Sequence, residues 1–132
     1  MQTMAIPSFL LPESVQRADG ESPAVELGSA QGKLIVLTLG ITRIIEQESL
    51  DVSIWASSDG QSWMDKPLAA FPQKFYCGTY TILVDLTDHP EVTHLKATWK
   101  MGRWGRGTPN PMFGFYLFAK PAKGEIARMV GV

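Results

Sequence analysis

The chain contains a single cysteine, Cys77, and two histidines among its 132 residues. One cysteine excludes an intramolecular disulfide and a metal cage built from thiolates, and it agrees with a reducing compartment. The formal net charge is −1, so the basic excess that a binder of nucleic-acid phosphates normally carries is missing. We therefore expect no nucleic-acid partner, no metal and no cofactor.

Long apolar runs are also missing. The N-terminal "MQTMAIPSFLLPESVQ" has no basic start, and Pro7 and Pro12 interrupt its short apolar run. Such a segment is neither a signal peptide nor a membrane span, so we expect a protein of the cytoplasm that makes no membrane contact. With 45% hydrophobic and 19% charged residues, the chain is apolar enough to build the core of one globular domain.

Five segments alternate apolar and polar residues with a period of two, which predicts strands. Their expected inward residues are Ile35, Leu37, Leu39 and Ile41; Leu50, Val52, Ile54 and Ala56; Tyr80, Ile82, Val84 and Leu86; Leu95, Ala97, Trp99 and Met101; and Phe113, Phe115 and Leu117. Tight turns separate the segments and no amphipathic helix lies between them. The pattern predicts an all-β fold, an antiparallel β-sandwich or jelly roll.

Three regions follow from this pattern. Residues 1–32 contain prolines and glycines too often for a helix, and we expect an irregular N-terminal arm with short strands at "SFLLPESV" and "AVELG". Residues 33–120 form the sandwich core, and residues 121–132 form a C-terminal tail in which "GEIARMV" has the composition of a short helical turn.

The segment "SIWASSDGQSW" contains a strong turn signal. Asp59 tolerates a left-handed backbone and bonds its own backbone, while Gly60 takes a positive φ without a Cβ penalty. Trp63 then stands where it can fold back onto the strand that carries Trp55. We interpret the turn as a device of shape and not of chemistry.

The order of three segments resembles known families. "LDVSIWASSDGQSW", followed by a loop and "THLKATWK", is similar to the discoidin or coagulation-factor type C modules, which have a galactose-binding-like β-sandwich. With "GTPNPMFGFYLF" added, the pattern resembles most closely the small virion proteins of tailed phages and prophages. The terminal cysteine pair of discoidin modules is missing, and "KPLAAFPQKFYCGTY" is an unusually aromatic insertion. The resemblance implies a sandwich fold, admits a virion-associated location and transfers no site residue.

The loop "KMGRWGRGTPNP" is a candidate binding site. Lys100, Arg103 and Arg106 flank Trp104, and basic residues beside an aromatic ring stack on a sugar, a base or another protein. The alternative is that Trp104 caps the end of the sandwich and the arginines only keep it soluble.

The segment "FPQKFYCGTY" is a candidate interface. Phe75, Tyr76 and Tyr80 make it too aromatic to be wholly exposed, so it either lines the core or joins a subunit interface. We expect Cys77 to be a small buried apolar residue, because nothing in the chain provides a base at a recognisable spacing for a nucleophile.

The segment "DHPEVTH" holds both histidines beside acidic residues. Pro90 prevents a helix here, so His89 and His94 cannot form the helical pair of a metalloprotease, and we interpret the segment as a loop that enters a strand.

Because no catalytic signature is present, we expect a non-catalytic structural or assembly protein whose partner is a second copy or a larger array. The alternative is a carbohydrate- or ligand-binding module with a glycan partner.

Overall fold

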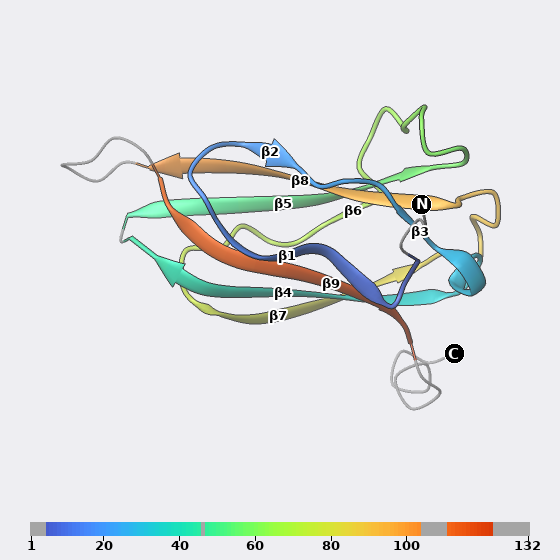
Figure 1. Cartoon of the computed structure of the whole chain (residues 1–132), viewed down its shortest axis with the longest axis horizontal. Coiled ribbons are helices and arrows are strands. Elements are labelled where there is room, and N and C mark those ends of the chain that lie inside the picture. Colours follow the sequence, from blue (N-terminus) through green and yellow to red (C-terminus); the bar gives the residue numbers. More distant parts are fainter. Residues whose placement is uncertain (1–4, 46, 104–110, 123–132) are drawn as a thin grey trace.

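The structure is a computed structural model, and it describes residues 5–45, 47–103 and 111–122. These residues form two antiparallel sheets packed face to face, which confirms the predicted all-β sandwich (Figure 1). The elements are β1 (Ser8–Gln16), β2 (Gly20–Glu21), β3 (Val25–Glu26), a short 3₁₀ helix η1 (Gly28–Ala30), β4 (Leu34–Ile44), β5 (Glu48–Ser57), β6 (Ala69–Ala70), β7 (Gly78–Asp85), β8 (His94–Arg103) and β9 (Phe113–Pro121).

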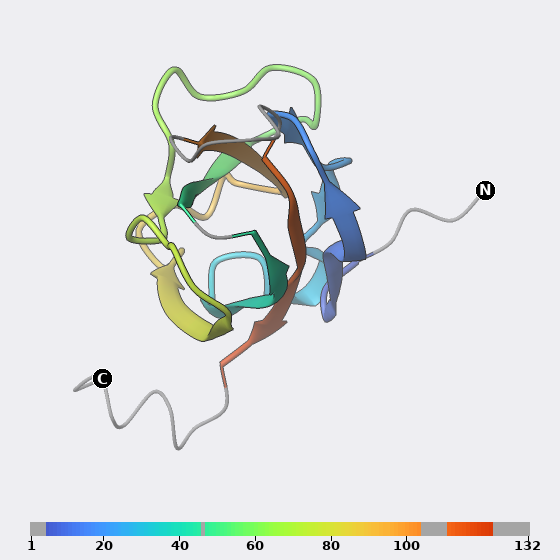
Figure 2. The same cartoon turned by 90° about the vertical axis from the view of Figure 1, so that its left-hand side faces the viewer.

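One sheet has the order β1-β9-β4-β7 and the other β2-β8-β5-β6, with β3 also paired to β8. The turn after β4 carries the chain from the first sheet into β5 of the second. Seen along the strands, β7 and β1 lie on opposite sides of the sandwich (Figure 2). In the described part of the chain, no helix has the length and apolar character that crossing a membrane requires.

The core lies between the sheets and follows the predicted alternation. The inward residues of β4, β5 and β9 are all buried, as are Val84 and Leu86 on the β7 side and Leu95, Ala97 and Trp99 on β8. Tyr80, Ile82 and Met101 are partly buried and pack against this cluster. The Trp99 ring of one sheet meets the Phe115 ring of the other edge-on, with centroids 5.5 Å apart. Aromatic pairs of this geometry contribute about 1 kcal/mol beyond the area they bury.

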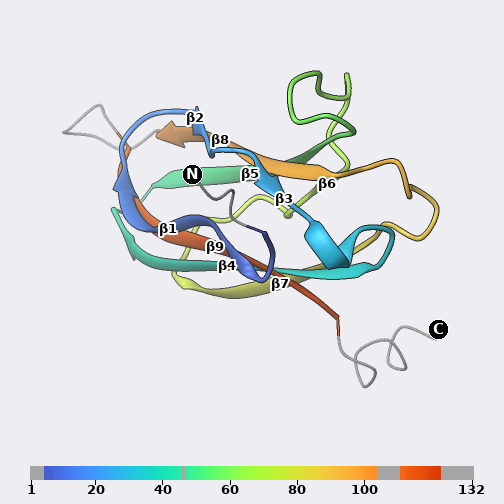
Figure 3. The ribbon, with the colours of Figure 1, turned by 45° about the vertical axis from the view of Figure 1, so that its right-hand side comes forward.

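The N-terminal region differs from the expected arm. The two expected short strands are present, but they belong to the sandwich: the nine-residue β1 pairs with β9, with interruptions in register, and β2 and β3 pair with β8. Residues 8–26 thus pass from one sheet to the other along one side of the molecule (Figure 3). Pro12 lies within β1, where the register with β9 shifts between Leu11 and Ser14. Proline is compatible with this position because an edge strand leaves half of its N–H groups unpaired. The segment "GEIARMV" lies outside the described residues.

Candidate functional site

The segment between β6 and β7 exposes two aromatic side chains. Phe75 is 39% exposed and Tyr76 is 72% exposed, and their ring centroids lie 6.4 Å apart. Only Cys77 separates this pair from the start of β7, which is an edge strand of its sheet. We call Phe75, Tyr76, Tyr80 and the outer edge of β7 the β7 edge surface.

The path of the chain explains this exposure. The backbone after β6 continues along β5, where the Phe71 N–H donates to the Val52 carbonyl at 3.0 Å and the Lys74 N–H to the Leu50 carbonyl at 3.0 Å. The chain then crosses to the other sheet, in which Tyr80 of β7 lies opposite Leu39 of β4. Phe75 and Tyr76 lie on this crossing, away from the space between the sheets.

Tyr80 behaves differently from the exposed pair. Its ring packs against the core, its hydroxyl donates to the Tyr76 carbonyl at 3.0 Å, and the Lys74 Nζ lies 4.0 Å from the ring centroid. Tyr80 therefore holds the backbone that presents Tyr76. Of the two alternatives for this segment, core lining is wrong for Phe75 and Tyr76, whereas the interface role stays a prediction.

Cys77 corrects another expectation. The thiol is exposed and not buried among the neighbouring aromatic residues, because the crossing carries Cys77 outside the core. It is also far from the histidines: Cys77 precedes the end of β7 that pairs with Ile41, whereas His94 begins β8 opposite Ser57. These positions are at opposite ends of the sandwich.

The predicted basic loop is described only in part. Lys100 is exposed on β8 opposite Asp51, and Arg103, the last residue of β8, is half-buried opposite Glu48. Trp104 and Arg106 lie outside the described residues, so the proposed cluster of these side chains stays a prediction.

Glu48 is a buried carboxylate at the same end of the sandwich, and the sequence pattern did not single it out. It is 1% exposed. Its Oε2 accepts from the Ile45 N–H at 2.9 Å, and its Oε1 accepts from the Met112 N–H at 2.9 Å. Glu48 thus joins the turn between β4 and β5 to the backbone that leads into β9. An acidic residue at the position where a strand follows a turn is the only signal that the sequence offers for this role.

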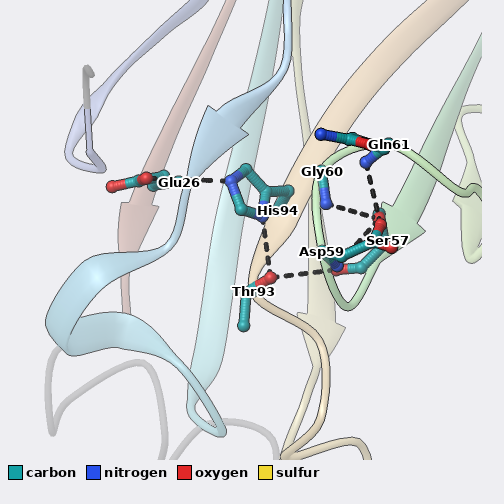
Figure 4. A network of polar contacts seen from close by, with 7 residues as sticks. All are labelled: Glu26, Ser57, Asp59, Gly60, Gln61, Thr93 and His94. Atoms are coloured by element: carbon teal, nitrogen blue, oxygen red, sulfur yellow. Dashed lines mark hydrogen bonds and ion pairs between the residues drawn. The ribbon is translucent and has the colours of Figure 1, made fainter.

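The Asp59-Gly60 turn adopts the expected shape (Figure 4). The Asp59 Oδ1 accepts from the Gln61 N–H at 2.8 Å, and the Ser57 Oγ accepts from the Gly60 N–H at 2.8 Å. The same Asp59 Oδ1 also accepts from the Ser62 N–H at 2.8 Å. Gly60 has a φ of 81°. Trp63 then forms an antiparallel bridge with Ser57, as predicted from the turn signal. The N–H groups of Ser62 and Gln61, and then the Ser57 hydroxyl, lower the pKa of the Asp59 carboxyl below its usual value.

His94 lies under this turn. Its Nδ1 is 2.7 Å from the Thr93 Oγ1, and its Nε2 is 3.8 Å from the Glu26 Oε1 (Figure 4). An open hollow of about 410 Å³ lies beside it, lined in part by Glu26, Asp59 and His94. A second hollow of about 250 Å³ lies beside Trp63 and is lined in part by Ser58 and Glu91.

The remaining histidine also has an acidic neighbour, since the His89 Nδ1 lies 3.6 Å from the Glu91 Oε2. Within residues 5–45, 47–103 and 111–122, no three His, Cys, Asp or Glu side chains are grouped so that they could hold a metal ion.

Comparison of the chain with protein-family models and with curated protein sequences finds no match.

Proposed function

We propose that this protein is a non-catalytic assembly protein, a β-sandwich that makes homotypic contacts through the β7 edge surface. The observation that carries the proposal is the exposure of Phe75 and Tyr76 as adjacent rings on the crossing that leads into an edge strand. Tyrosine and phenylalanine are enriched where protein interfaces are fully buried, because they remove much apolar area from water at a low cost in side-chain entropy.

The surroundings of the pair suit a protein contact. Tyr80 and Lys74 fix the backbone at the base of the exposed rings, so little further ordering is needed when a partner binds. The Phe75–Tyr76 pair also leaves its polar neighbours satisfied, since the Tyr76 carbonyl already accepts from the Tyr80 hydroxyl.

We propose that this contact is made within a larger array, such as a virion shell or tail. The support is the resemblance of the chain to small virion proteins, in which turns and strands match and no chemical group does. A contact between two copies of a small sandwich would supply the paired unit from which such an array is built.

Sedimentation velocity over a range of concentrations tests the proposal on the full chain. We expect Phe75→Ser/Tyr76→Ser to weaken self-association at least about tenfold, because both copies lose their aromatic contacts. Phe9→Ser is the control for loss of an exposed aromatic ring elsewhere: Phe9 is 43% exposed and lies on β1, at the other edge of the same sheet, where its ring meets those of Phe118 and Tyr116 edge-on. Self-association that Phe9→Ser and the double variant weaken equally would remove the assignment to this surface.

A second candidate function is the binding of a glycan or another small ligand at the turn end. The observation that favours it is the hollow of about 250 Å³ beside Trp63, whose lining includes the polar residues Ser58 and Ser62. A tryptophan beside hydroxyl groups provides a stacking surface and hydrogen-bond partners for a sugar ring. A glycan array with the wild-type chain and Trp63→Ala separates the outcomes: binding that the variant abolishes supports this function, and absence of binding removes it.

A further inference from the structure

The edges of the two sheets are not equally protected against pairing with another chain. An edge strand presents unpaired N–H and C=O groups, and proteins usually block it with proline, charge, bulges or very short length. In the described residues, β1 has Pro12 and shifts in its register with β9. β2 and β3 have two residues each with Pro23 between them, and β6 has two residues flanked by Pro67 and Pro72.

β7 has neither proline nor a bulge, and it is not short. It runs for eight residues, "GTYTILVD", without proline or lysine, and it pairs with β4 without any register shift. Threonine, tyrosine, isoleucine and valine are strong strand formers. Its only charged residue is Asp85, at the end of the strand. Within residues 5–45, 47–103 and 111–122, β4 is the only strand that pairs with it.

The register shows which backbone groups of β7 face outward. Asp85 lies opposite Leu34, so the next pair along the two strands is Leu86 opposite Lys33. This pair is hydrogen-bonded, because the Leu86 N–H donates to the Lys33 carbonyl at 3.1 Å. Because hydrogen-bonded pairs alternate along antiparallel strands, Tyr80, Ile82 and Val84 bond to β4. The N–H and C=O groups of the residues between them point away from β4, and these residues are Thr79, Thr81, Leu83 and Asp85.

We infer that β7 pairs antiparallel with β7 of a second copy of this chain, so that one continuous sheet crosses both copies. The inference rests on the proposed homotypic assembly and specifies its contact. A two-fold axis beside Ile82 places Thr81 opposite Leu83 of the other copy and Tyr80 opposite Val84, an aromatic and β-branched pair that stabilises sheets. Asp85 then lies opposite Thr79, so the two carboxylates do not face each other.

Charge and sequence favour a second copy over a foreign strand. The strand matches itself in this register without like-charge repulsion, and roughly eight backbone hydrogen bonds form between the outward groups of the two copies. Phe75 and Tyr76 precede the strand and extend the contact beyond its first residue.

Amide hydrogen exchange of the wild-type chain, followed by NMR at low and high protein concentration, tests the inference directly. We expect the amides of Thr81 and Leu83 to exchange rapidly in the dilute protein and at least about tenfold more slowly in the concentrated protein. The amides of Ile82 and Val84, which bond to β4, are the internal control and stay protected at both concentrations.

Thr81→Pro provides a second measurement. It removes an outward N–H and no hydrogen bond to β4, so the fold is retained while the dissociation constant rises roughly 30-fold, because each of the two copies loses a hydrogen bond. Thr81→Val is the control: it keeps the outward N–H and should leave the dissociation constant unchanged.

The outcomes distinguish the inference from the proposal on which it rests. Association that protects Thr81 and Leu83 and is weakened by Thr81→Pro supports strand pairing. Association that depends on Phe75 and Tyr76 but leaves the Thr81 and Leu83 amides unprotected overturns strand pairing alone. A chain that stays monomeric at high concentration overturns both.

Discussion

Replacement of Glu48 tests how the two sheets are held together at one end. The carboxylate is 1% exposed and accepts N–H donors from Ile45 and Met112, each at 2.9 Å. A hydrogen bond to a charged group contributes about 1.5–3 kcal/mol, and the lower value applies here because both contacts are only partly buried. Glu48→Ala removes both acceptors, so we expect the free energy of unfolding to fall by about 3 kcal/mol. Glu48→Gln keeps one carbonyl acceptor but turns its NH₂ group toward the other N–H donor. Its loss of unfolding free energy should be about half to two-thirds of that for Glu48→Ala.

Urea unfolding measures these losses. The slope of the unfolding free energy against urea concentration stays the same if both variants unfold from the same compact state. The urea concentration at the midpoint of unfolding should decrease in the order wild type, Glu48→Gln, Glu48→Ala. The control is Glu91→Ala: the Glu91 side chain is 61% exposed and lies 3.6 Å from His89, so we expect a loss below about 0.5 kcal/mol. A loss for Glu48→Ala as small as that of the control refutes the role assigned to this carboxylate.

Three further predictions concern the turn, its acid and the exposed thiol. Gly60→Ala and Gly32→Ala each place a Cβ at a positive φ, 81° and 72° respectively, and each should lower the free energy of unfolding by about 1 kcal/mol. The loss should be larger for Gly60→Ala, because the new Cβ meets the His94 Nε2 at 3.0 Å. Equal losses in urea unfolding would contradict the packing of His94 under the turn. Because the pKa of Asp59 is lowered in the folded state, its ionised form adds stability that is complete above the ordinary carboxyl pKa and is lost as the pH falls through the lowered pKa. Asp59→Asn should therefore make the free energy of unfolding depend less on pH below about pH 4. A pH profile of stability identical to that of the wild type would contradict this. Alkylation of the exposed Cys77 thiol should be fast in dilute native protein and should slow as the protein concentration rises. An alkylation rate independent of protein concentration would count against burial of Cys77, beside Tyr76, in the assembly.

The sandwich was predictable because its central strands repeat a simple pattern. In β5, Leu50, Val52 and Ile54 alternate with polar residues and are all buried, since a period of two places them on one face of the sheet. The place of β1 was not predictable in the same way. Pro12 indicates irregular structure when the sequence is taken alone, and only the pairing with β9 shows that it lies on an edge, where proline does little harm.

The candidate site was predictable as a group of residue types but not as a surface. The aromatic density of "FPQKFYCGTY" identified Phe75, Tyr76 and Tyr80, yet their exposure depends on where the chain crosses between sheets, which local pattern does not determine. The same crossing explains why Cys77 is exposed although free cysteine is usually buried. Glu48 gave no strong signal, because a buried carboxylate is recognisable only from the two N–H groups that surround it.

The measurement that tests the central claim most directly is the molar mass of the wild-type chain at sedimentation equilibrium, recorded as the concentration is raised. One chain has a mass of 14.5 kDa. The account predicts that the mass-average value rises above this figure toward that of two or more copies, and that substitution at Phe75 and Tyr76 suppresses the rise. A value that stays at 14.5 kDa throughout would contradict the assignment of the β7 edge surface as a contact between copies.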